Sequence, residues 1–249
     1  MSPEHRLMEQ PPAFVPPGPV PVALFGKHPG HGDFVSAGMP DGLARLLSDW
    51  LGSTLGEVRD LLGPDWEGVT RSPGGLRFWL GAAFGEGQAW RGTMRMSGDK
   101  VGRHYPLVLL QPSAPDGLPL IFPSQEFYLA AEEALGDLID QAVLALPETA
   151  AALTARLGQC PGAEQGTLRH EHMFWAMKQS SDVAELCREV GMTDLVCGAT
   201  ARSYWWFANP RAGQSGILGC QGLPDAQALA WLIAGSSGEH AVSEGSEDQ

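Results

Sequence analysis

The chain contains little lysine, and this shortage limits the partners that it can have. Only three of its 249 residues are Lys, and Lys and Arg together number 16 against 29 Asp and Glu, for a formal net charge of −13. No run of basic residues occurs anywhere in the sequence. Because such a charge repels polyanions, nucleic acid is excluded as a primary partner.

Long apolar runs and a secretory signal are also missing. The longest apolar stretches, such as Val22–Phe25 and Ala228–Ala234, fall short of the ~18 residues that span a bilayer. No basic segment leads into an apolar run at the amino terminus. The cysteines form no C-x-x-C pair and match no zinc spacing; they are Cys160, Cys187, Cys197 and Cys220. We therefore expect a cytoplasmic protein with reduced, buried thiols and no membrane insertion.

What the chain does contain is typical of a globular domain between two polar ends. It holds 32 Gly and 20 Pro, which excludes a coiled coil, and 43% of its residues are hydrophobic. Residues 1–20 carry six prolines, so a disordered lead is expected there. Residues 236–249 carry four acidic residues and no Lys or Arg, which predicts a disordered acidic tail. A single domain is expected over residues 21–235.

Strand and helix patterns alternate through this domain. Short apolar runs bounded by Gly or Pro predict strands at Val20–Phe25, Leu76–Leu80, Ala89–Met96, Tyr105–Gln111, Ser203–Ala208 and Gly216–Gly219. Apolar stripes predict helices that begin at Asp41 and Ser124, each as the capping residue, and after Pro147, with further helices at Asp182–Val190 and Asp225–Ala234. Helices on both faces would bury such strands, so the expected fold is a three-layer α/β/α sandwich with a mixed sheet.

The common catalytic motifs are absent. Gly26-Lys27 follows a predicted strand, but Pro21 and His28 stand where a phosphate-binding loop needs Gly and Ser or Thr. Gly30-His31-Gly32 lacks the third glycine of a dinucleotide fingerprint, and no G-x-S-x-G nucleophile elbow occurs.

Two loops nevertheless carry polar residues at strand ends. His28, His31 and Asp33 could converge on a metal ion, but loop-shaping hydrogen bonds from Asp33 are the favoured interpretation, and no metal or cofactor is expected. His170 and His172 are interpreted as a solvated polar face.

The second loop holds Ser97, Asp99, Lys100 and Arg103 in a turn around Gly98 and Gly102. Its Arg103 could bind an anion, while an internal Asp99–Arg103 pair that locks the turn is favoured.

The pair Trp205-Trp206 lies on a predicted strand, where neighbouring side chains point to opposite faces. One indole is therefore expected in the core and the other at a surface, where an aromatic side chain could anchor a partner.

Three segments resemble one family. They are LFGKHPGHGDFVSAGMP at 24–40, GTMRMSGDKVGRHYPL at 92–107 and SYWWFANPRAGQSGILGCQGL at 203–223. Together they are similar to TagF, also called ImpM, an accessory protein of bacterial type VI secretion systems. Met96 departs from the family's usual Pro and His28 from its common aliphatic residue, which affects local turn geometry.

The resemblance implies a cytoplasmic, non-enzymatic α/β/α protein that represses secretion after translation by binding the forkhead-associated (FHA) scaffold protein. The hypothesised partner-binding residues are Lys27, His31, Asp33, Phe34, Ser97, Asp99, Arg103 and Trp206. The alternative is a small-ligand or phosphate-binding sensor or hydrolase that uses His31, Asp33, Asp99 and Arg103.

Overall fold

The computed structural model describes residues 22–114, 117–121, 123–158, 191, 195 and 198–237. The strands in these ranges are β1 (Ala23–Gly26), β2 (Val35–Ala37), β3 (Gly75–Leu80), β4 (Trp90–Gly98), β5 (His104–Pro112), β6 (Arg202–Asn209) and β7 (Gln214–Gln221). The α-helices with given bounds are α1 (Asp41–Leu62), α2 (Trp66–Arg71), α3 (Glu126–Ile139), α4 (Leu146–Leu157) and α6 (Ala226–Ser237).

The strands form one seven-stranded sheet in the order β2-β1-β5-β4-β3-β6-β7. All six pairings between these described strands are antiparallel, so the expectation of a mixed sheet is wrong. Short links join β3 to β4, β4 to β5 and β6 to β7, and a short link between adjacent strands imposes antiparallel pairing. The expectation fails at β1–β5 and β3–β6, where long connections also bring the strands back antiparallel.

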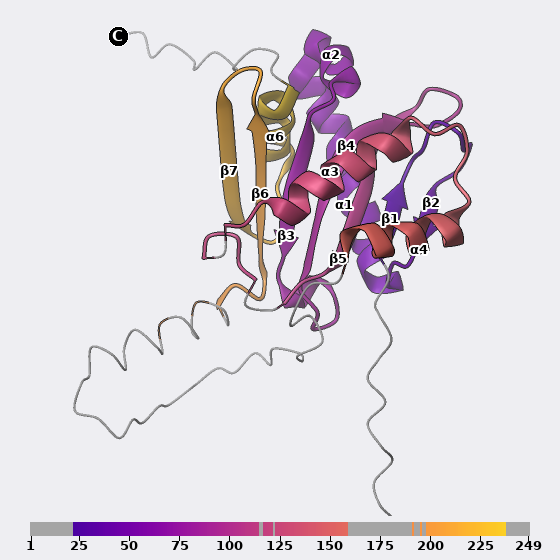
Figure 1. Ribbon diagram of the computed structural model, residues 1–249. Coiled ribbons are helices and arrows are strands. Elements are labelled where there is room, and N and C mark those ends of the chain that lie inside the picture. Colours follow the sequence, from indigo (N-terminus) through magenta and orange to yellow (C-terminus); the bar gives the residue numbers. More distant parts are fainter. Residues whose placement is uncertain are drawn as a thin grey trace, which may run out of the picture.

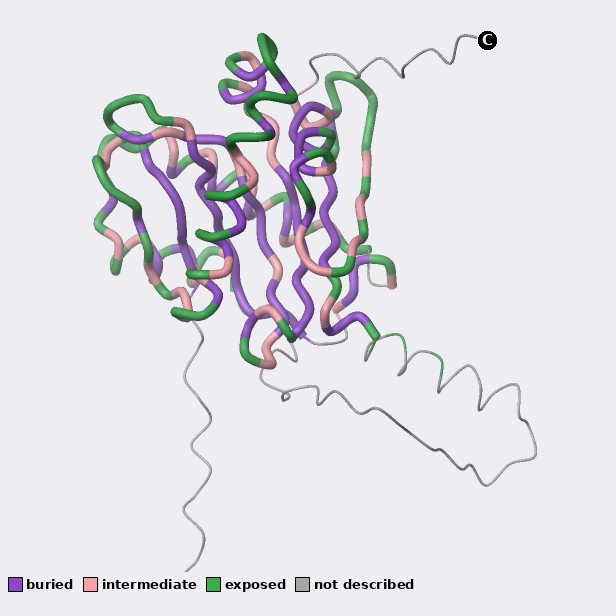
Figure 2. The backbone as a smooth tube through the Cα atoms, turned by 180° about the vertical axis from the view of Figure 1, so that it is seen from behind, coloured by how far each residue is buried: buried purple, intermediate pink, exposed green. Residues whose placement is uncertain are grey.

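Helices cover both faces of the sheet, which makes the fold α/β (Figure 1). Along β1, Ala23 and Phe25 face the core beneath α1, α2 and α6, whereas Leu24 faces α3 and α4. This alternation explains why the strands read as continuous apolar runs. Seen from behind in Figure 2, the inner strands are largely buried, whereas the edge strand β7 and the loops at the strand ends are more exposed.

Helix positions follow the predicted apolar stripes, but both predicted caps are wrong. The α1 helix begins at Asp41 after Pro40, whose carbonyl accepts a hydrogen bond from the Ala44 amide at 2.9 Å, and no side chain caps it. The α3 helix is preceded by Gln125 in place of Ser124, also without a side-chain cap. Tertiary contacts along the helix contribute to the stability of α1, as shown by the buried indole N–H that Trp50 donates to the Pro224 carbonyl (2.7 Å).

Two elements, β2 and α2, are absent from the sequence-based expectations. The helix α6 continues to Ser237, two residues into the segment expected to be a tail. Among the helices of the described ranges, none is long and apolar enough to cross a membrane. The expected lead at 1–20, the rest of the tail and the expected Asp182–Val190 helix lie outside the described residues, as do His170, His172 and three of the cysteines.

Candidate functional site

The two polar loops meet at one end of the sheet. Lys27 directly follows β1, and the turn that carries Asp99 and Arg103 joins β4 to β5. Because β5 lies between β1 and β4 and pairs with both, the sheet topology brings the two loops together. The Lys100 amide donates a hydrogen bond to the His31 carbonyl at 3.0 Å, which joins their backbones directly.

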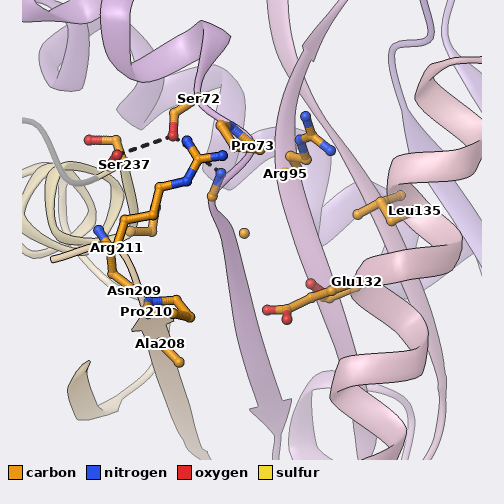
Figure 3. Close-up of a pocket in the computed structure, with 14 residues that line it drawn as sticks. Ser72, Pro73, Arg95, Glu132, Leu135, Ala208, Asn209, Pro210, Arg211 and Ser237 are labelled. Carbon is orange, nitrogen blue, oxygen red and sulfur yellow. Dashed lines mark hydrogen bonds between the residues drawn. The ribbon is translucent and has the colours of Figure 1, made fainter. Parts of the chain in front are cut away.

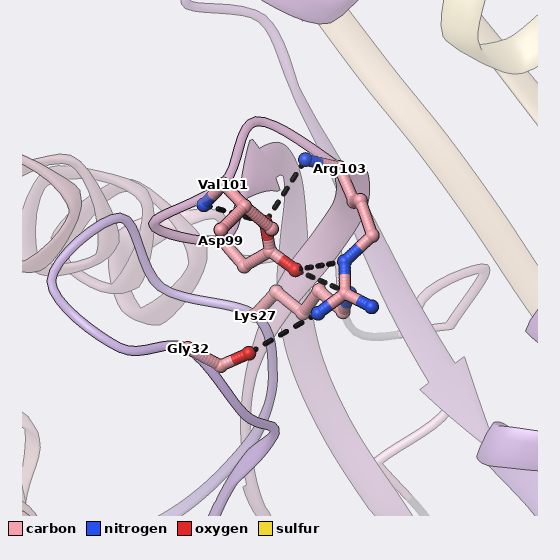
Figure 4. Close-up of polar contacts among 5 residues, drawn as sticks. All are labelled: Lys27, Gly32, Asp99, Val101 and Arg103. Carbon is pink, nitrogen blue, oxygen red and sulfur yellow. Dashed lines mark hydrogen bonds and ion pairs between the residues drawn. The ribbon is translucent and has the colours of Figure 1, made fainter.

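Asp99 is the centre of this contact (Figure 4). One carboxylate oxygen accepts from Lys27 Nζ at 2.7 Å and from Arg103 Nε at 2.5 Å. The other accepts from the backbone amides of Val101 (3.0 Å) and Arg103 (2.9 Å). Lys27 above all, with the donors of the turn, holds the pKa of Asp99 well below its usual range despite burial. The expected Asp99–Arg103 pair is confirmed, and Lys27 is a further partner.

Arg103 also connects the turn to the first loop. Its guanidinium donates to the Gly32 carbonyl at 3.2 Å, as Figure 4 shows. In the turn, the Asp99 amide donates to the Arg103 carbonyl at 3.1 Å, and Gly102 has a φ of 84° that favours glycine. We call the contacts of Lys27, Gly32, Asp99 and Arg103 the Asp99 network.

The two histidines of the first loop bond to backbone groups. Buried His28 accepts a hydrogen bond from the Gly30 amide at Nδ1 (3.0 Å), so its Nε2–H donates to the Leu138 carbonyl (2.7 Å). Burial lowers the pKa of His28 from 6.5, which favours this neutral form. His31 Nε2 accepts from the Leu144 amide at 3.1 Å. The His28 ring therefore fastens the loop to the last turn of α3, and the His31 ring fastens it to the segment that follows α3.

Two predicted site residues make no such bonds. Asp33 is exposed and has no polar partner among the residues that the structure describes, so the expected loop-shaping hydrogen bonds are wrong. The Ser97 hydroxyl is buried and also meets no partner within those ranges. In the described part of the chain, no three His, Cys, Asp or Glu side chains gather where they could hold a metal ion.

Around the Asp99 network, several side chains face solvent. Phe34 is 52% exposed, Val101 72% and the Arg103 side chain 63%. The Phe34 and Tyr105 rings meet edge-on with their centroids 4.8 Å apart, and Lys27 Nζ lies 5.2 Å from the Phe34 centroid. We call residues 27–34 with 98–103 the loop–turn surface. Val101 is not among the site residues predicted from the sequence, because an apolar residue at the tip of a turn is only a weak indication of a binding surface.

Trp205 and Trp206 lie on β6, which is separated from β1 by the three strands β5, β4 and β3. They point to opposite faces, as predicted, but Trp206 is only 7% exposed. Its indole N–H donates to the Gln125 side chain at 2.9 Å, and its ring meets Tyr128 edge-on at 4.6 Å. The expectation of an exposed indole in this pair is therefore wrong, because α3 covers that face of the sheet.

The fold and the site define an α/β protein in which two loops, distant in sequence, are joined through one buried carboxylate. A family model described as the TagF N-terminal domain, type VI secretion system-associated, matches residues 23–156, more than half of the chain and both loops. The chain therefore belongs to the TagF family, and its TagF domain links it to type VI secretion.

Solved structures support the same fold. The crystal structure of PA0076 from Pseudomonas aeruginosa PAO1 is similar with a TM-score of 0.63 and 24% sequence identity. The similarity covers 89% of this chain and 96% of that one. At this identity it is evidence for the fold alone. The comparison with curated proteins gives no match.

Proposed function

We propose that this chain is a non-enzymatic regulator that represses type VI secretion after translation by binding the FHA scaffold protein in the cytoplasm. The observation that carries the proposal is the loop–turn surface, where Phe34, Val101 and Arg103 are exposed around the buried Lys27–Asp99 ion pair. Exposed aromatic and arginine side chains on a fixed frame are the residues that contribute most at protein interfaces.

The same geometry supports binding over hydrolysis. Asp99 has both oxygens occupied and a strongly lowered pKa, so it is a poor general base near neutral pH. The ring nitrogens of His28 and one nitrogen of His31 are committed to backbone groups. We further infer that the helices on the two faces make a three-layer α/β/α sandwich, with this surface at one end.

Phe34 and Asp33 are the best positions for testing the surface. Neither side chain makes a hydrogen bond or ion pair of the Asp99 network, so substitution removes none of them. Leu129 on α3 is 55% exposed and serves as a control matched to Phe34. Asp49 on α1 is exposed, like Asp33, and is the control for charge reversal.

The experiment is isothermal titration calorimetry of the purified chain with the FHA scaffold, phosphorylated or unphosphorylated. We expect micromolar or tighter binding to at least one form. Phe34→Ala and Asp33→Lys are expected to weaken it about tenfold or more, whereas Leu129→Ala and Asp49→Lys leave it unchanged. Equal affinities of test and control variants would refute the surface, and absence of binding to both forms would refute the function.

A further inference from the structure

A row of arginines lies beneath α3. On β4, Arg91 and Arg95 each lie two residues from Thr93, and Arg77 on the neighbouring β3 is paired in register with that threonine. Because side chains two apart on a strand share a face, the three arginines point to the same side of the sheet. Arg77 contacts Glu132 of α3 and Arg91 contacts Phe127 of α3, so this is the face that α3 covers.

Two arginines of the row have partners. Arg77 makes a bidentate pair with Glu132 at 2.8 and 2.7 Å and donates to Gln125 at 2.7 Å. The Arg91 guanidinium lies 3.9 Å from the centroid of the Phe127 ring. Arg95 differs, since its Nε is buried and meets no acceptor among the described residues. A buried donor without an acceptor is uncommon and calls for a ligand or another explanation.

Arg95 lines a cavity of about 160 Å³ between β3, β4, α3 and the end of α6. Arg211, from the β6–β7 connection, lines it as well, and Figure 3 shows its side chain extending toward Ser72. The Ser72 and Thr93 hydroxyls donate to backbone carbonyls, whereas the Arg95 and Arg211 guanidinium groups donate to no acceptor within the ranges that the structure describes. On the α3 side, Gly136 makes room for Arg95, since a Cβ there would lie 3.3 Å from its Nη1.

We propose that this cavity is a binding site for a phosphate monoester. Two guanidinium groups match the charge of about −1.5 to −2 that a phosphate monoester carries near neutral pH, whereas one carboxylate supplies only half of it. The Glu132 carboxylate also lines the cavity, but its bidentate pair with Arg77 neutralises it. Phosphate oxygens would accept hydrogen bonds from the Arg95 and Arg211 guanidinium groups that line the cavity. None of the loop–turn residues lines this cavity, so the inference is independent of scaffold binding.

The test is calorimetric titration of the whole chain with inorganic phosphate, a phosphothreonine peptide and, as a carboxylate, glutarate. We expect phosphate to bind, and Arg211→Gln and Arg95→Gln each to weaken it about tenfold or more. Arg211 is exposed on a connection, so its variant keeps the fold even if the Arg95 variant does not. Arg59→Gln, an exposed arginine of α1, is the control and is expected to bind phosphate normally.

The arms also identify the source of the phosphate group. Binding of the peptide at least tenfold tighter than inorganic phosphate would assign the site to a phosphorylated side chain, and comparable binding would assign it to a free phosphate compound. The proposal is overturned if phosphate does not bind, if Arg211→Gln binds it as the unaltered chain does, or if glutarate binds equally well.

Discussion

Replacing Lys27 with Met tests whether the Asp99 network is a structural frame. The Lys27 ammonium is buried and lies 2.7 Å from the Asp99 carboxylate. Removing one partner of a buried ion pair costs about 3–5 kcal/mol, and the lower end applies because three other donors remain on Asp99. With an m-value of about 3 kcal/mol per molar urea, the unfolding midpoint is expected to fall by about 1 M.

The matched control is Lys100→Met, which removes an exposed lysine next to Asp99 in sequence and is expected to stay within about 0.5 kcal/mol. The pH dependence provides a second check. Since folding lowers the pKa of Asp99, its contribution is present above the unfolded pKa near 3.8 and is lost as pH falls toward the folded pKa. The difference in free energy of unfolding between Lys27→Met and the unaltered chain should therefore become smaller below about pH 4. Equal midpoints for the two lysine variants, or a difference that does not change with pH, would refute this reasoning.

Three further predictions concern other parts of the frame. Gly26→Ala is expected to lower the free energy of unfolding by more than about 2 kcal/mol, because Gly26 has a φ of 127° and a Cβ there would lie 2.0 Å from a carbonyl oxygen of β5. The control is Gly32→Ala, whose Cβ would meet nothing within 4 Å and which should cost less. Urea unfolding of the two variants compares these costs. Arg77→Leu leaves the Glu132 carboxylate of α3 without its partner and should lower the free energy of unfolding by about 3 kcal/mol in the same assay. Arg71→Leu, which removes an exposed ion pair, should lower it by less than about 0.5 kcal/mol. Burial lowers the pKa of His28 below 6.5, so the folded chain binds fewer protons and loses stability as pH falls below that value; His28→Gln should lessen the loss between about pH 7.5 and 5.5.

Much of the fold could be predicted from local patterns. The apolar stripe of α1 and the Gly- and Pro-bounded strands are strong signals, and their positions agree with the structure within a few residues. The three residues of β2 are too few for a periodicity. Strand direction was mistaken because a continuous apolar strand is typical of a parallel sheet, yet it also arises in an antiparallel sheet covered on both faces.

The candidate site was predictable only in part. The pair of Asp99 and Arg103 lies within one turn, so their chemistry and spacing are enough to predict it. Lys27 is 72 residues from Asp99, and its role depends on β5 lying between β1 and β4, which no local pattern reveals. The burial of Trp206 depends likewise on where α3 packs.

The pairing of β6 with β3 has a consequence for the synthesis of the chain. The β3 strand ends at Leu80, but its neighbour β6 begins only at Arg202, about 120 residues later. At translation rates of about 5–20 residues per second, this delay lasts roughly 6 to 24 s. During this time the backbone N–H and C=O groups along one side of β3 have no strand partner. The apolar side chains of Phe78 and Leu80 lie on the same strand. The nascent chain therefore presents an edge that can pair with other chains until the last hairpin emerges, and chaperone binding to that edge would favour correct folding.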